Sequence, residues 1–215
     1  FIFGNLAQIR SDNIPYPIFN YTALIPWFYF SNVLNKTTTS LISNARLFSK
    51  VYFPRIILPL TSIFSSLVDF LLSFLVLILL MIYYSVIPSI NIIYLPILIF
   101  IMMLTASGIG LWLSALAIQY RDIPHALPFL SQILMYAAPI VWPISLFQEK
   151  FGESMTLLYG LYPMVGVIEG FRAILLNTEF IPWELISISF ITSMILFITG
   201  SLYFNYKERI FADVV

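Results

Sequence analysis

The stretch 70–120, FLLSFLVLILLMIYYSVIPSINIIYLPILIFIMMLTASGIGLWLSALAIQY, contains no charged residue. A helix that spans a membrane needs about 20 mainly apolar residues, so this run is too long for one span. Pro88 and Ser89 interrupt it, and residues of these types mark turns. The stretch therefore predicts a helical hairpin inside a membrane, with one helix over 57–86 and the other over 92–119.

The composition of the whole chain supports a membrane domain. Of the 215 residues, 60% are hydrophobic and 9% are charged, and the mean hydropathy is +0.96. A soluble domain has about 25% charged residues, because its surface faces water. The formal net charge is zero, which gives no reason to expect a nucleic-acid partner. The sequence has no Cys, which excludes disulfides, thiolate metal sites and thiol catalysis.

Three further segments are predicted to cross the membrane. Residues 185–206 carry no charge and consist largely of Leu, Ile, Phe and Met, which favour insertion. Residues 19–42 are apolar and aromatic at first and polar toward their end. Residues 128–147 contain Pro139, and a proline inside a spanning helix predicts a kink or a break. The expected fold is an all-α, polytopic membrane domain with five spans over 1–215.

The chain opens on Phe1, inside an apolar stretch. We therefore expect it to lack its natural N-terminus and the intact subunit to have six spans. Segment 147–183 is too apolar for a solvated loop. Within it, residues 155–162 and 164–176 are predicted to form two short amphipathic helices on the outer face. Such backbone can dip into a membrane only where it packs on protein or lines a cavity, so the two helices are expected to cover a pore mouth.

Lysine and arginine set the predicted orientation. With the loop 43–55 inside, the inner side carries six basic residues and the outer side three, in agreement with the positive-inside rule. The C-terminus is then cytoplasmic. The inner residues are Arg46, Lys50, Arg55, Arg121, Lys207 and Arg209, and the outer ones are Arg10, Lys150 and Arg172.

Several motifs occur along the chain in a fixed order. They are Asn44 with Lys50-Val-Tyr-Phe-Pro-Arg55 and Leu58-Pro59, Tyr120-Arg121-Asp122, Pro139 with Pro143, Pro163 with Glu169 and Arg172, and Glu208-x-x-Phe-Ala-Asp213. In these motifs and their spacing the chain resembles the type-two ABC exporter permeases. The resemblance is to the branch that exports polysaccharides and polyol phosphates, such as O-antigen, capsule and teichoic acid.

The resemblance implies a homodimer that binds two cytoplasmic ABC ATPase subunits. This assembly would move a lipid-linked glycan across the bacterial plasma membrane through the dimer interface. The chain would bind no cofactor itself, and the partner ATPase would bind ATP and Mg²⁺. The sequence contains no G-x-x-x-x-G-K-[ST], in agreement with this division of work. We therefore expect a transport subunit, surrounded by membrane lipid, and not an enzyme.

The two inner loops are candidates for contact with the ATPase. A short basic and aromatic helix, ended by Phe53-Pro54, could dock in a groove on a moving ATPase. Alternatively, its basic residues only set the topology. In the second loop, Tyr120 to Asp122, an ion pair between Arg121 and Asp122 is preferred to an ATPase contact. The candidate coupling loop consists of Asn44, Arg46, Lys50, Tyr52, Phe53, Pro54 and Arg55.

Two sets of ionisable residues lie outside these loops. Asp69 is an acid deep in an apolar span, and such a residue is a functional candidate. A proton relay would need ionisable partners, so packing in the dimer or pairing with the Lys36 region is the preferred interpretation. Glu169 and Arg172 lie three residues apart, on one side of a predicted helix. They either pair to hold a gate shut or form a solvated face, and with Tyr162 and Pro163 they make the candidate outer gate.

Aromatic residues make up 17% of the chain. Trp and Tyr collect at membrane interfaces for lipid reasons alone. The functional alternative is that aromatic rings stack on sugar rings along a glycan path, for which the candidates are Trp27, Tyr29, Phe30 and Tyr159. The sequence of Ala106, Gly108 and Gly110 predicts close helix packing.

Other classes of membrane protein remain open. A type-two ABC permease for another cargo, such as a drug or a lipid, would share the same spans and loops. A secondary transporter would need ionisable residues or broken helices at mid-membrane, where only Asp69 and the Pro139 break are available. A membrane enzyme would need clustered His, Asp or Glu, and His125 stands alone in the sequence, so no metal site is predicted.

Overall fold

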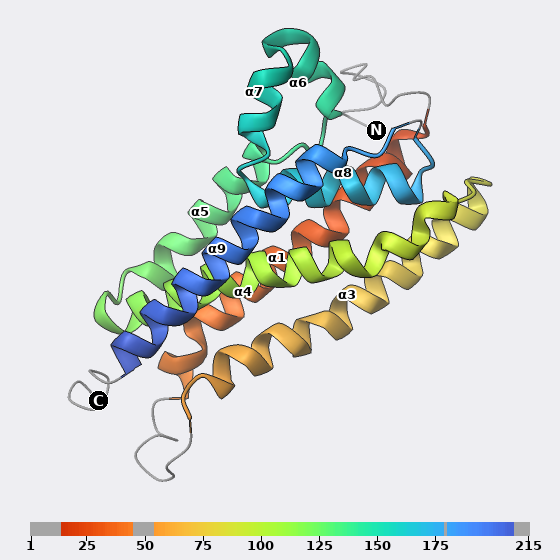
Figure 1. The fold of residues 1–215 in the computed structure, drawn as a ribbon. Helices are drawn as coiled ribbons and strands as arrows, with labels where there is room; N and C mark the ends of the chain where they lie inside the picture. Colours follow the sequence, from red (N-terminus) through yellow and green to blue (C-terminus); the bar gives the residue numbers. More distant parts are fainter. Residues whose placement is uncertain (1–13, 45–53, 179, 209–215) are drawn as a thin grey trace.

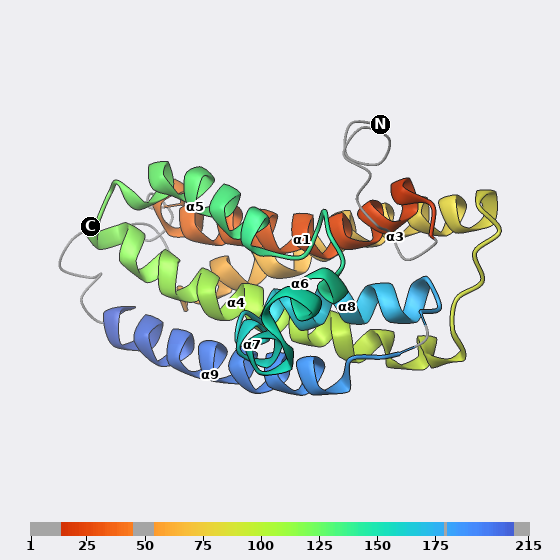
Figure 2. The ribbon, with the colours of Figure 1, turned by 90° about the horizontal axis from the view of Figure 1, so that it is seen from above.

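The computed structural model describes residues 14–44, 54–178 and 180–208, and this part of the chain contains helices and no strand. Four long helices, α1, α3, α4 and α9, run side by side (Figures 1 and 2). The elements are α1 (Tyr16–Ser43), α3 (Ile57–Tyr83), the 3₁₀ helix η2 (Ile90–Tyr94), α4 (Leu95–Gln119), α5 (Ile123–Ala137), α6 (Ile144–Phe151), α7 (Glu153–Tyr159), α8 (Pro163–Leu175) and α9 (Trp183–Glu208).

Three helical segments are long and apolar enough to cross a membrane. They are Ile57–Tyr83, Ile90–Gln119 and Trp183–Glu208, and a fourth span is possible if the bent pair α7 and α8 counts as one. Many of their large apolar side chains point away from the bundle, as expected where lipid is the solvent. The predicted hairpin is confirmed, and so is the predicted helix at 185–206.

Helix α1 is long but less apolar than these three. Its 28 residues give a length of about 42 Å, more than the roughly 30 Å hydrocarbon core. It packs against α3, α4, α5 and α8, and more than half of its residues are buried. Because its neighbours are helices, polar side chains are tolerated there, and the Thr38 hydroxyl donates to the Leu34 carbonyl at 2.6 Å. The helix predicted at 19–42 is present, and its role as a span stays a prediction.

The prediction of one span over 128–147 is wrong. Helix α5 begins at Ile123 and ends at Ala137, and its 15 residues reach about 22 Å, too short to cross the hydrocarbon core. The chain is extended at Ala138 and at Pro143, after which α6 begins. The predicted break near Pro139 is therefore confirmed. Its physical cause is that proline has no N–H group to continue a helix.

The outer segment folds into three short helices. Two of them, α7 and α8, meet at an angle of 107° across residues 160–162. These two helices were expected from the sequence, whereas α6 was not predicted. All 13 residues of α8 are buried, and this helix packs against α9, α1 and α4. Helices α6 and α7 stand out from the bundle near α8 and the start of α9 (Figures 1 and 2). Helix α8 also carries Glu169 and Arg172, and charged side chains buried this deeply need partners.

The α4–α9 pair packs with its backbones in close approach, as the small residues of 106–110 predicted. A Cβ atom added at Gly108 would lie 2.6 Å from the Leu196 carbonyl carbon, and one added at Gly200 would collide with the Gly108 carbonyl oxygen. On the same crossing, the Thr105 and Ser193 hydroxyls share a hydrogen bond of 2.7 Å. Small residues permit this approach, and the hydroxyl pair adds a polar contact inside the membrane domain.

Candidate functional site

Arg172 lies at the end of the bundle where α8 packs against α1, the end predicted to face outward. It extends from α8, its side chain is 2% exposed, and its Nη1 forms a 2.8 Å ion pair with Oε1 of Glu169. The guanidinium also stands over the Phe19 ring of α1, with Cζ 3.8 Å from the ring centroid. The interpretation of Glu169 and Arg172 as a solvated face is therefore wrong, because both side chains are buried. The ion pair itself, one of the two alternatives, is confirmed, and its role in holding a gate shut stays a prediction.

The guanidinium of Arg172 binds the chain that follows α5. Its Nη1 donates to the Pro139 carbonyl at 2.6 Å and to the Trp142 carbonyl at 3.3 Å, and its Nη2 donates to the Ile140 carbonyl. Its Nε donates to the Phe19 carbonyl at 3.5 Å. The planar fork of arginine suits several acceptors at once, whereas a lysine ammonium is a point charge.

The prolines explain why these carbonyls need a donor. A helix break leaves backbone carbonyls without intrahelical partners, and in a membrane domain water does not satisfy them. Pro139 and Pro143 enforce such a break after α5. The sequence showed the break and the arginine separately, and their contact depends on how α8 packs beside the turn.

Two tyrosines fasten the outer helices to the end of α5. The Tyr162 hydroxyl donates to the Leu134 carbonyl at 3.2 Å, and the Tyr159 hydroxyl donates to the Ala137 carbonyl. Tyr162 is the N-cap residue of α8, and Pro163 takes the first helical position, where its missing N–H costs nothing. All four residues of the predicted outer gate thus lie in one connected region.

The structure places three of the four candidate glycan-path aromatics in the core. The side chains of Trp27, Tyr29 and Phe30 are at most 2% exposed, and the Tyr29 hydroxyl donates to the Ile63 carbonyl. The structure does not support a path-lining role for these three. Tyr159 is half-buried, and its ring stacks on Phe147 at a centroid distance of 4.8 Å.

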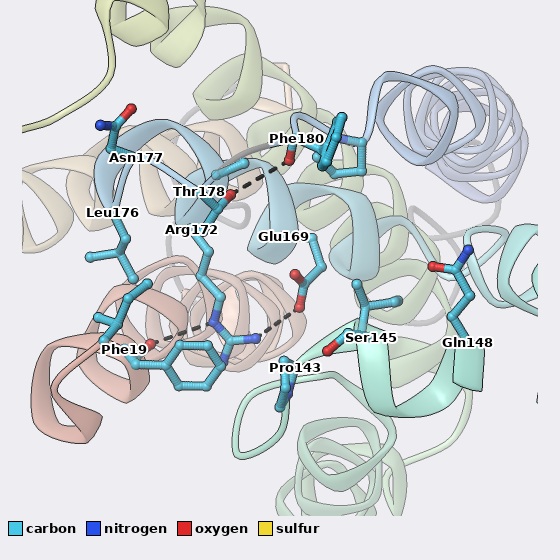
Figure 3. Close-up of a pocket in the computed structure, with 14 residues that line it drawn as sticks. Phe19, Pro143, Ser145, Gln148, Glu169, Arg172, Leu176, Asn177, Thr178 and Phe180 are labelled. Carbon is cyan, nitrogen blue, oxygen red and sulfur yellow. Dashed lines mark hydrogen bonds and ion pairs between the residues drawn. The ribbon is translucent and has the colours of Figure 1, made fainter. Parts of the chain in front are cut away.

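A cavity of about 650 Å³ opens beside the Glu169–Arg172 pair (Figure 3). Its walls come from the start of α1, the start of α6, the second half of α8 and the connection from α8 to α9. The ion pair lies at the side of the cavity, and Gln148 and Asn177 lie on opposite sides of it (Figure 3). No sequence feature indicated this cavity.

The opposite end of the bundle, predicted to be cytoplasmic, brings other predicted residues together. The backbone N–H of Arg55 donates to Oε1 of Glu208 at 3.1 Å, and Nη1 of Arg55 donates to the Glu208 carbonyl at 3.2 Å. The start of α3 is thereby joined to the end of α9. Asn44 caps the end of α1, where its Nδ2 donates to the Ser40 carbonyl at 2.8 Å, and Pro54 is exposed. Arg46, Lys50, Tyr52 and Phe53 lie outside the described residues.

The prediction of an ion pair between Arg121 and Asp122 is wrong. Both residues belong to the described part of the chain and are exposed, and no ion pair joins them there. The Asp122 carbonyl instead accepts the backbone N–H groups of His125 and Ala126, which starts α5. Tyr120 is exposed in the same connection, and nearby Lys207 of α9 donates to Oε1 of Gln119 at 3.1 Å.

Asp69 pairs with Lys36, one of the two interpretations preferred from the sequence. Lys36 Nζ lies 3.0 Å from Asp69 Oδ2, and the side chains are 45% and 56% exposed, respectively. Asp69 lies near the middle of α3, so the pair joins two long helices within the membrane domain. Among the described residues, no three His, Cys, Asp or Glu side chains are arranged to hold a metal ion.

Comparisons with known proteins identify the family. Residues 1–176 match the family described as ABC-2 type transporter. The O-antigen export system permease protein RfbA of Klebsiella pneumoniae is 29% identical over 216 residues, which cover 100% of this chain and 81% of that protein. The protein of the same name from Myxococcus xanthus is 25% identical over 209 residues, covering 96% of this chain and 79% of that protein. The chain therefore belongs to the ABC-2 type transporter family.

Proposed function

We propose that this chain is the membrane subunit of an ATP-driven exporter that moves a lipid-linked polysaccharide across the bacterial plasma membrane. The observation that carries the proposal is the end-to-end similarity to O-antigen export system permease proteins from two organisms. The fold supports it with apolar spans and a sharply bent helix pair.

Energy for transport comes from a separate ATPase in this proposal. The sequence has no P-loop with which to hold ATP phosphates. The candidate coupling loop, 44–55, connects the end of α1 to the start of α3, and Arg55 links that start to the end of α9. A displacement of the loop by the ATPase would therefore act on three helices together.

The outer gate is the second moving part that we propose. Arg172 and Glu169 close the outer end by holding the turn after α5 against α8 and α1. Opening the gate requires the carbonyl groups that accept hydrogen bonds from Arg172 either to separate from its guanidinium or to move together with it. A partly separated ion pair would leave charged and polar groups without partners in a low-dielectric setting, which is unfavourable. The gate therefore has two well-separated states, one closed and one open.

The working unit is a homodimer with two ATPase subunits, and its C-termini lie in the cytoplasm. The exposure of the Lys36–Asp69 pair supports the presence of a second copy of this chain. An ionised group facing lipid at mid-membrane costs about 3 kcal/mol on the insertion scale, yet both side chains here are about half exposed on one protomer. A partner protomer on this side, or a water-filled path between the two, would remove that cost.

Depletion of the intact gene in its host tests the proposal. The expected result is that the glycan accumulates inside the cell on its lipid carrier and disappears from the surface. A strain whose partner ATPase cannot hydrolyse ATP is the matched control and should show the same accumulation. Normal surface polymer in a depleted strain without a second exporter would contradict glycan export and leave an ABC-2 permease for another cargo.

A further inference from the structure

We infer that the cavity beside Arg172 is a binding subsite for an uncharged, hydroxyl-rich ligand, and the glycan's own sugar residues fit this description. The inference rests on the proposed function and adds a place at which the polymer is held at the outer end. It starts from the cavity volume of about 650 Å³, which lies within the roughly 300–1,000 Å³ usual for ligand pockets.

The charges at the cavity argue against an anionic ligand. Glu169 and Arg172 line it, and they neutralise each other at 2.8 Å. The guanidinium also donates to four backbone carbonyls, those of Phe19, Pro139, Ile140 and Trp142. A phosphate would have to displace these partners and would leave Glu169 unpaired in a buried position, which is strongly unfavourable.

Three further polar side chains of the cavity are neutral and available, whereas the Thr178 hydroxyl donates to the Phe180 carbonyl at 3.5 Å. Ser145 and Gln148 come from α6, and Asn177 follows α8. Their side chains make no hydrogen bond within the described residues, so hydroxyl and amide groups are free to donate and to accept. Sugar hydroxyl groups also donate and accept, and neutral amides and hydroxyls are their natural partners.

The cavity also has an exposed aromatic ring. Phe180 lines the cavity and is 84% exposed. Its face is available for stacking, unlike that of Phe19, which is covered by the Arg172 guanidinium. A sugar ring has an apolar face of C–H groups and, around its edge, hydroxyl groups. The Phe180 ring can stack on the apolar face, and the neutral polar side chains can bind the hydroxyl groups. Weak contacts of this kind also let a polymer move on.

A binding measurement on the complete transporter tests the inference. The transporter, with both subunit types, is placed in lipid nanodiscs. The probe is the fluorescently labelled oligosaccharide released by mild acid from the host's surface polysaccharide. The double variant Gln148→Ala/Asn177→Ala should bind about tenfold more weakly, as expected from the loss of two neutral hydrogen bonds. Ser145→Trp, which fills the cavity, should abolish binding.

Glu149→Ala is the matched control, because Glu149 is exposed on α6 and does not line the cavity. It should bind the oligosaccharide as the wild type does, and inorganic phosphate should not compete. Wild-type affinity in either cavity variant, or displacement of the probe by phosphate, overturns the inference. Failure of the wild type to bind while gene depletion still stops glycan export also overturns it and leaves the proposed function intact. A depleted strain with normal surface glycan contradicts the proposed function instead.

Discussion

Arg172 shows how one side chain makes a broken helix tolerable inside a membrane domain. The turn after α5 presents carbonyls that a continuous helix would have satisfied, and the guanidinium supplies their donors. Glu169 balances the positive charge, so that burial of the pair leaves no net charge. The same contacts that stabilise the turn also fix the position of α8, which is why this residue is both structural and the centre of the proposed gate.

Replacing Arg172 with alanine should destabilise the outer end of the bundle. The change leaves Glu169 buried and unpaired and removes the donors to the turn, and breaking a buried pair in this way costs about 3–5 kcal/mol. Arg172→Lys should rescue little, because one ammonium cannot reach the same set of acceptors. The measurement is the thermal unfolding of the purified transporter, together with glycan export in cells.

Lys150→Ala is the control for this prediction. Lys150 is exposed on α6 and makes no ion pair within the described residues, so its loss should change stability by less than about 0.5 kcal/mol. Unfolding of Arg172→Ala at the wild-type temperature would show that the turn does not depend on the guanidinium.

At the scale of elements, the α4–α9 crossing depends on two glycines. A methyl group at Gly200 would overlap the Gly108 carbonyl oxygen and lie 2.9 Å from Trp112 Cδ1, so Gly200→Ala must push the helices apart. Overpacking of this kind costs about 1–3 kcal/mol. We expect a lower yield of monodisperse protein and a lower unfolding temperature.

Gly110→Ala provides a graded comparison on the same helix. Its methyl group would meet the Thr37 side chain at 3.0 Å, and a side chain can move where a backbone carbonyl cannot. The loss of stability should therefore be smaller than for Gly200→Ala. An equal or larger loss would mean that the α1–α4 contact, and not the α4–α9 crossing, limits the packing of the bundle.

The coupling loop gives the second prediction for an element. Replacing Phe53-Pro54 with Ala-Ala should lower transport-coupled ATP hydrolysis several-fold while the two subunit types still assemble. Ile57 and the rest of α3 start beyond this change, so the helix itself should form as before. ATP hydrolysis measured with and without the glycan substrate separates the two effects. Unchanged coupling would show that transmission occurs elsewhere, and the connection Tyr120–Asp122 would be the next candidate.

Sequence reasoning succeeded where one physical signal dominated. The charge-free run predicted α3 and α4 because lipid excludes charge so strongly. It failed for α5 because an apolar run does not by itself distinguish a spanning helix from a shorter helix that ends at a proline break. Spacing alone placed Glu169 and Arg172 on one side of a helix. Their burial and their carbonyl partners come from packing between elements far apart in the sequence.

The aromatic residues show the same limit. Trp27 and Phe30 pack on each other with ring centroids 5.3 Å apart, inside the core that α1 shares with its neighbours. An interfacial belt, a glycan path and a protein core all favour aromatic rings, so composition cannot choose between them. The cavity at the outer end was missed for a related reason, since its polar residues come from three separate segments of the chain.

On the scale of the whole molecule, the bundle has two chemically different ends. One end gathers the connection between α4 and α5, the start of α3 and the end of α9, where Arg55 binds Glu208 and Lys207 binds Gln119 (Figure 1). The other end carries α6, α7, the gate and the cavity. By the positive-inside rule, the basic residues at the first end predict that this end is cytoplasmic.

Labelling with a membrane-impermeant maleimide tests this orientation directly. The 215-residue sequence has no Cys, so each introduced cysteine gives this chain a single thiol. Glu149→Cys and Glu153→Cys, both exposed at the outer end, should react in intact spheroplasts. Arg121→Cys and Asp122→Cys, exposed at the other end, should react only after the membrane is permeabilised. The reverse pattern would place the coupling loop outside, where no ATPase can reach it. The expected pattern would place Arg172 and the cavity at the exit, the side on which an exported polymer must be released.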